Sequence, residues 1–327
     1  MINQYIGDYE IKDIQVQVRK IIKGLGNPEP PLDLRDVREL LKLDRKYYSS
    51  TDDGILQEYI SKLKIAGKQI LKRPALLGEI IRKAKLSALW LPDRKRILID
   101  ANVPKLKHRW CEGHEVNHGI IPWHCQYLFG DSKDTLSQSC YEQLEREANY
   151  GTGQLLFLMD RFQQEALDYP PTLKTVIILS KKFGNTMTST LWRFVEEAHK
   201  NLPVLGVISQ HPSYLNNEFD NENPCKYFIR SSRFAEEFGS VSETQIFENI
   251  TGYCNSSRGG FLGEEELVIK DDNGEEHIFK FQSFSNRYEV LTLAVYHCKV
   301  NVIVSPKIFI EGAGSSKAMR NPELAEG

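Results

Sequence analysis

One short stretch, HEVNH at residues 114–118, constrains the fold more than any other part of the sequence. Side chains four residues apart lie on the same face of an α-helix, so His114 and His118 can hold one zinc ion from one side. Glu115, between them, can act as a general base for water at the metal. The apolar pattern around the motif predicts a helix over about residues 104–121. The sequence therefore predicts a zinc-dependent peptidase site on this helix.

A catalytic zinc needs a third protein ligand, and the sequence offers three candidates. His124 has the spacing of the metzincin pattern HExxHxxGxxH, although Ile121 stands where that pattern has glycine. Glu145 and Glu147 lie in a later helical segment, where gluzincins carry a ligand glutamate. Asn149 follows Glu145 by four residues and can accept a hydrogen bond from a ligand histidine. We predict Glu145 as the ligand, keep Glu147 and His124 as alternatives, and expect one of the two glutamates to be an ordinary solvated carboxylate.

The composition narrows the kind of protein. Of 327 residues, 42 are Lys or Arg and 44 are Asp or Glu, so a net charge of -2 gives no global attraction to nucleic acid or to an anionic membrane. The six cysteines form no CxxC pair, and the N-terminal sequence lacks the basic and apolar regions of a secretory signal. We expect a soluble cytoplasmic protein that neither enters a membrane nor binds nucleic acid directly.

The apolar pattern changes character near residue 201. Before it, the pattern predicts a β-hairpin in which SALWL and RILID flank the turn PDRK, and helices over residues 10–24, 33–40, 54–85, 139–167, 172–184 and 187–200. After it come runs typical of strands, such as LPVLGVIS, KYFIRS and VLTLAVYH. We therefore expect an α+β protein with three parts. These are a mostly helical zincin-like domain with a small β-sheet over residues 1–201, a β-rich α+β domain over 202–312, and a disordered tail over 313–327.

Several of these stretches, in the same order, resemble the ImmA/IrrE family of zinc metallopeptidases. The resemblance rests on SALWLPDRKRILIDANVPKLKHRWCEGHEVNH, on LEREANYGTGQLLF and on LSKKFGNTMTSTLWRFVEEA. The second stretch is similar to the family's E-x-x-A-N-x-F-A-x-x-L-L run, in which Glu145 stands at the matching acidic position. Gly151 and Thr152 replace the Phe-Ala of that run, a departure that affects packing more than ligands.

The resemblance implies an intracellular zinc endopeptidase with one catalytic Zn2+, acting on a regulatory protein. Some members cleave a helix-turn-helix repressor and so switch on stress or mobile-element genes. The alternative is a regulator or antitoxin that keeps the peptidase fold without proteolysis, and the intact motif with Glu115 argues against it. By analogy with regulated peptidases, we expect residues 202–312 to be a sensor or partner-docking module that metal binding does not require.

Overall fold

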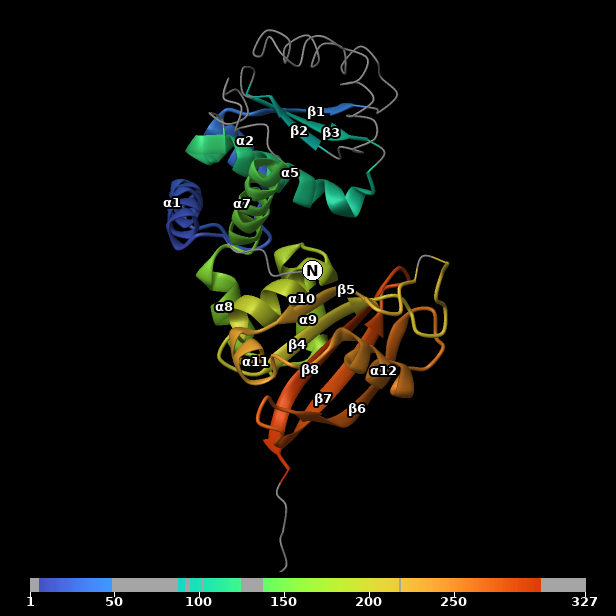
Figure 1. The fold of residues 1–327 in the computed structure, drawn as a ribbon. Helices are drawn as coiled ribbons and strands as arrows, with labels where there is room; N and C mark the ends of the chain where they lie inside the picture. The colour runs from blue at the N-terminus through green and yellow to red at the C-terminus, as the bar shows by residue number, and fades with distance from the viewer. Residues whose placement is uncertain are drawn as a thin grey trace, which may run out of the picture.

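The computed structural model describes residues 6–48, 88–91, 95–101, 103–124, 138–217 and 219–300, and within them the chain has the predicted α+β fold. Figure 1 shows two groups of elements, each built around a sheet. The first group comprises α1 (Asp8–Gly24), α2 (Leu34–Leu41), β1 (Asp44–Tyr48), β2 (Ala88–Leu91), β3 (Arg96–Asp100), α5 (Lys105–Ile120) and α7 (Gln138–Leu156). The second comprises α8 (Asp160–Leu167), α9 (Leu173–Phe183), α10 (Met187–Arg193), the π-helical turn η4 (Phe194–Ala198), β4 (Val204–Ser209), β5 (Cys225–Arg230), α11 (Ser232–Glu237), α12 (Glu243–Tyr253), β6 (Gly260–Lys270), β7 (Glu276–Ser285) and β8 (Val290–Lys299).

Two predicted segments, the helices over residues 54–85 and the tail over 313–327, lie outside the described residues. Among the described residues, none of the helices has the length and apolar character needed to cross a membrane.

The two N-terminal helices form where the sequence predicts them. α1 buries Ile14, Val18 and Ile21, which share one helix face. α2 begins after Asp33, whose carboxylate accepts a hydrogen bond of 2.7 Å from the backbone N–H of Arg35. Such a cap satisfies a donor that the first helical turn leaves without an intrahelical partner. Both helix predictions are confirmed.

The three-stranded sheet supports the helix that carries the HEVNH motif. β2 and β3 pair antiparallel, which confirms the predicted pairing of these two strands, and β1 adds parallel to β3 in the order β1-β3-β2. Most of the predicted turn PDRK lies outside the described residues. The sequence pattern does not predict β1, because DRKYY is mostly polar and Asp44 pairs with Arg96, 52 positions later. Ile97 and Ile99 of β3 are fully buried, and α5 packs against β2 and β3.

The prediction of a single helix over residues 139–167 is wrong, because this segment forms two separate helices, α7 and α8. Between them Leu158 and Met159 have φ angles of 55° and 54°. A positive φ angle raises the conformational free energy of a non-glycine residue by about 1 kcal/mol or more. Both side chains are buried, and the Met159 backbone N–H donates to the Gln154 carbonyl at 2.8 Å. Burial of two large apolar side chains offsets the backbone strain. Helical spacing alone does not reveal such a turn, since the apolar residues continue through it.

The five-stranded sheet is antiparallel throughout, in the order β5-β4-β8-β7-β6, and its strand β4 is covered on both faces. On β4, Val204 and Ile208 join an apolar cluster with residues of α10 and η4. Leu205 and Val207 join a second cluster with residues of α11 and α12. Every residue of β4 is therefore buried. This two-sided burial explains the continuous apolar run LPVLGVIS, since a strand buried on one face alternates.

The apolar core continues across the boundary predicted near residue 201. Leu191, Phe194 and Val195, before it, are fully buried in the same cluster as Val204, Leu293 and other residues after it. The approach is close, because a β-carbon on Gly206 would lie 3.0 Å from Cγ2 of Val195. That residues 1–201 form a separate domain stays a prediction. Because the core is shared, a chain cut at residue 201 tests it.

We predict that a chain ending at residue 201 will aggregate. Without β4 and β8, the large apolar side chains Leu191, Phe194 and Val195 lose part of their cover. Fully burying a large apolar side chain stabilises a fold by about 1.5–3 kcal/mol. Soluble yield and gel filtration of this chain, of one ending at residue 312 and of the full chain provide the measurement. A soluble, zinc-loaded chain of residues 1–201 would instead support two separable domains.

Candidate metal centre

The motif helix α5 is fixed by a buried ion pair two residues before His114. Glu112 is 3% exposed and pairs with Arg38 of α2 and with Arg45 of β1, the latter at 2.7 Å. A buried carboxylate is stable only while its cationic partners stay in place. The pair therefore ties α5 to both α2 and β1, and it opposes any shift of the helix that carries the two histidines.

α7 crosses α5 closely enough to bring a third side chain to the histidines. A β-carbon on Gly151 would lie 2.2 Å from Oδ1 of Asn117, a distance that real contacts do not allow. A β-carbon on Gly113 would lie 3.1 Å from Cγ2 of Thr152. Glycine at these positions therefore permits the approach of the two helices, and Gly151 is one of the departures from the ImmA/IrrE run. The crossing brings Glu145 over the motif.

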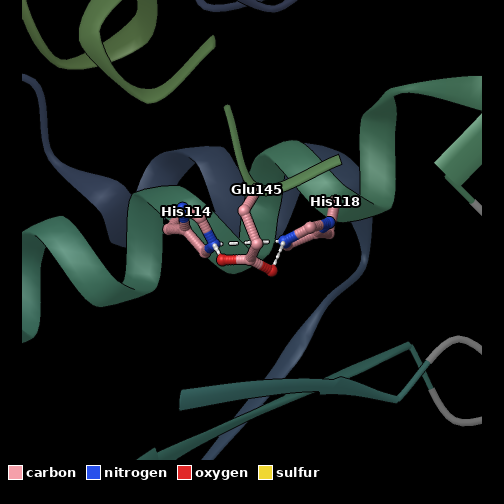
Figure 2. A group of neighbouring side chains, drawn as sticks. All are labelled: His114, His118 and Glu145. Atoms are coloured by element: carbon pink, nitrogen blue, oxygen red, sulfur yellow. Dashed lines mark hydrogen bonds and ion pairs between the residues drawn. The ribbon is translucent and has the colours of Figure 1, made fainter. Parts of the chain in front are cut away.

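Three electron-pair donors converge between α5 and α7. Nε2 of His114 lies 3.1 Å from Oε2 of Glu145, and Nε2 of His118 lies 3.4 Å from Oε1 of the same carboxylate. The two Nε2 atoms are 3.1 Å apart. Figure 2 shows both rings and the carboxylate pointing toward one another. The structure thus brings together the three residues that the sequence predicts as zinc ligands.

The donor set fits a zinc ion. Tetrahedral zinc with ligands at 2.0–2.2 Å keeps those ligands about 3.3–3.6 Å apart, and the three separations of 3.1–3.4 Å come close to this. Two imidazoles and one carboxylate also form a known catalytic zinc set that leaves a position open for water. Small movements of the side chains would give ideal geometry.

A hydrogen bond from the outer nitrogen of each histidine orients its ring. Nδ1 of His114 lies 3.1 Å from Oδ1 of Asn149, and Nδ1 of His118 lies 2.9 Å from Nδ1 of His124. The amide oxygen of Asn149 can only accept, so the proton of His114 is on Nδ1 and Nε2 is free to bind metal. Asn149 has the contact that its spacing from Glu145 predicts.

The electrostatics of the three groups favour a bound cation. Burial raises the pKa of Glu145, but the adjacent imidazoles of His114 and His118 outweigh it and hold this pKa well below its usual range. Burial lowers the pKa of His118 to about 4, so its ring is neutral at pH 7. For His114 burial also lowers the pKa, but the hydrogen bond with Glu145 and the charges of Glu115 and Glu145 raise it overall. The negative charge of Glu145 between the two rings therefore favours a positive charge at this point, which a divalent cation would supply.

The two alternative ligands lie behind His118, away from the converging atoms. His124 is fully buried, with Nε2 2.9 Å from Oε2 of Glu147. Glu147 is 1% exposed and also accepts hydrogen bonds from Nε1 of Trp123 at 2.6 Å and from Nε2 of Gln143 at 2.9 Å. The expectation that one of the two glutamates is solvated is therefore wrong. Trp123 and Gln143 were not predicted from the sequence as partners of Glu147, although Gln143 and Glu147 have the spacing i, i+4.

A second group of potential ligands among the described residues lies at the β6–β7 turn: Asp271, Glu275 and His277. The turn itself accounts for the group, because the Asp271 carboxylate accepts from the backbone N–H groups of Asn273 at 2.9 Å and of Glu275 at 2.8 Å. Lys299 pairs with Glu275 at 2.5 Å. We assign no metal to this turn.

Comparisons with known proteins do not identify the chain. No protein-family model matches the sequence, and no curated protein matches it. Among solved structures, a Mycobacterium tuberculosis transcriptional regulator is similar with a TM-score of 0.49 and 10% sequence identity, over 93% of this chain and 94% of that chain. A likeness at this level carries no argument about fold or function, so the functional argument rests on the site.

We predict that Glu145→Gln weakens zinc binding by about 100-fold or more, because it removes the negative charge and one donor of the set. Glu142→Gln, on the exposed surface of the same helix, is the matched control and should bind zinc as the wild type does. Chelator competition gives both dissociation constants. A larger loss from Glu147→Gln or His124→Gln than from Glu145→Gln would mean that the third ligand is assigned wrongly.

Proposed function

We propose that the protein is a zinc-dependent endopeptidase that hydrolyses peptide bonds of a regulatory protein. The observation that carries the proposal is the convergence of His114, His118 and Glu145 within 3.1–3.4 Å, with Glu115 adjacent in the HEVNH motif. This combination of two histidines, a carboxylate and a neighbouring glutamate is the donor and base set of HExxH peptidases. The resemblance to the ImmA/IrrE family supports the same reaction and suggests a helix-turn-helix repressor as the substrate.

The reaction assigns separate tasks to the metal and to Glu115. A zinc ion held by the three ligands would lower the pKa of a water molecule to about 7 and polarise the scissile carbonyl group. Glu115 takes a proton from the water that attacks the carbonyl carbon. Glu115 then gives this proton to the amine nitrogen as the C–N bond breaks. Its carboxylate is close enough to raise the pKa of His114 by its charge, which supports this role.

The small sheet offers a way to hold an extended substrate. Among the described strands β2 is paired on one side only, by β3, and α5 packs against both strands. A peptide that adds to β2 as a further strand would form main-chain hydrogen bonds along the side of the sheet next to α5. Main-chain pairing requires an unfolded or extended stretch of substrate, as expected for cleavage within a loop or linker of a regulatory protein.

We predict that Glu115→Gln abolishes cleavage while zinc stays bound. The amide cannot take a proton from water, and loss of general-base catalysis lowers turnover by about 100- to 10,000-fold. Zinc content by atomic emission and cleavage of a fluorogenic unstructured peptide library measure the two effects on the same preparation. Glu248→Gln, exposed on α12, is the control and should leave both unchanged.

Three outcomes of this experiment have different meanings. A Glu115→Gln protein with near-normal cleavage would remove Glu115 as the base. A wild-type chain that binds zinc but cleaves neither peptides nor candidate repressors would favour the non-proteolytic regulator. A wild-type chain that binds no zinc would overturn the proposal altogether.

A further inference from the structure

A buried chain of polar groups leads from α7 to the back of His118. Oε2 of Glu147 lies 2.9 Å from Nε2 of His124, and Nδ1 of His124 lies 2.9 Å from Nδ1 of His118. The exposed fractions of the three residues are 1%, 0% and 6%. Burying three polar side chains is unfavourable unless each is hydrogen-bonded. The buried arrangement therefore depends on the hydrogen bonds that link Glu147, His124 and His118.

The direction of each hydrogen bond follows from the acceptor at the start. A carboxylate can only accept, and Glu147 does so from three donors, Nε2 of His124, Nε1 of Trp123 and Nε2 of Gln143. His124 therefore carries its proton on Nε2, and with one proton on the ring its Nδ1 is an acceptor. His118 must then donate from Nδ1. The lone pair of His118 is consequently on Nε2, the atom that faces His114 and Glu145.

We infer that Glu147 and His124 are positioning residues for His118, forming a relay that holds this ring in the tautomer and orientation that bind the metal. The inference rests on the proposed function, because it assigns a task to residues around the zinc set. Outer hydrogen bonds to ligand histidines fix the ring and raise its basicity, and their loss typically lowers metal affinity about 10- to 100-fold. Here the carboxylate acts through a second imidazole.

The two histidine ligands have unequal outer partners. Asn149, which orients His114, is a neutral amide on the exposed face of α7 and also accepts from Nε1 of Trp110 at 3.4 Å. The relay behind His118 is anionic at its far end and fully enclosed. An anionic acceptor holds an N–H donor more strongly than a neutral amide does, above all where water is excluded. The relay should therefore matter more for metal affinity than Asn149.

The first experiment measures zinc dissociation constants by chelator competition for the full chain and its variants. Glu147→Gln should weaken binding about 10- to 100-fold, since the amide oxygen is a weaker acceptor for His124 and Trp123, and the amide NH2 replaces the oxygen that accepts from Gln143. His124→Phe should weaken it at least as much, and His124→Gln, which keeps an acceptor for Nδ1 of His118, should recover part of the loss. Asn149→Ala should have a smaller effect than Glu147→Gln. The Co2+ absorption spectrum should shift in Glu147→Gln, because the ligand field at His118 changes.

Combining the variants separates a relay from direct ligation. If Glu147 acts only through His124, Glu147→Gln added to His124→Phe should change the zinc dissociation constant little beyond the single variant. Independent, additive losses would overturn the relay. An unchanged dissociation constant and Co2+ spectrum in a folded Glu147→Gln protein would also overturn it, while leaving the proposed function intact. A wild-type chain without zinc would overturn both.

A measurement on the wild type avoids any dependence on how variants fold. Long-range 1H–15N NMR of the histidine rings in the zinc-loaded chain reports which ring nitrogen carries each proton. The relay predicts the proton on Nδ1 of His118 and on Nε2 of His124. A proton on Nδ1 of His124 would reverse the hydrogen bond between the two rings and overturn the inference.

Discussion

The site depends on the convergence of groups that repel one another without a cation between them. Nε2 of His114, Nε2 of His118 and the carboxylate of Glu145 lie 3.1–3.4 Å apart, and each can offer a lone pair. Asn149 and the His124–Glu147 pair hold the outer ring nitrogens, so the His114 ring cannot turn away without breaking an exposed hydrogen bond, nor the His118 ring without breaking a buried one. A proton or a metal ion must therefore supply positive charge at the centre. Bringing these groups together is unfavourable, and a bound metal ion would offset this penalty.

The packing of α5 and α7 makes this convergence possible. Gly113 and Gly151 let the two helices approach, and the pairing of Glu112 with Arg38 and Arg45 ties α5 to its neighbours. The support extends further, because the apolar cluster that contains Val116 of α5 also contains residues of α1, α9, α10 and β4. The sheet beyond residue 201 thus shares its core with the helices that carry the site. A change in that sheet could reach α5 through packed side chains.

The sequence determines which side chains of one helix share a face. It does not determine which of them meets a side chain of another helix. The spacing of His114 and His118 determines their common face once the segment is helical. Glu145 and Glu147 are two residues apart, about 200° around a helix, so they must point to different sides. Which side meets the zinc set depends on how α7 crosses α5, a non-local fact. The sequence therefore predicted one glutamate as a zinc ligand and the other as a solvated carboxylate. The structure instead shows Glu145 among the converging groups and Glu147 buried, accepting hydrogen bonds from three donors.

Because sequence patterns are local, they also account for where the predicted and observed folds differ. Helices and the hairpin rest on local periodicity and capping, as at Asp33, and they were predictable. β1 pairs with a strand 52 positions later, and the turn at Leu158 and Met159 is stabilised by burial that a linear pattern does not display.

The most direct test of the central claim is anomalous X-ray diffraction at the zinc absorption edge from crystals of the zinc-loaded full chain. We predict one strong peak, with Nε2 of His114, Nε2 of His118 and a carboxylate oxygen of Glu145 at about 2.0–2.2 Å. A peak ligated by His124 or Glu147, or no peak between α5 and α7 in a zinc-saturated crystal, would contradict it.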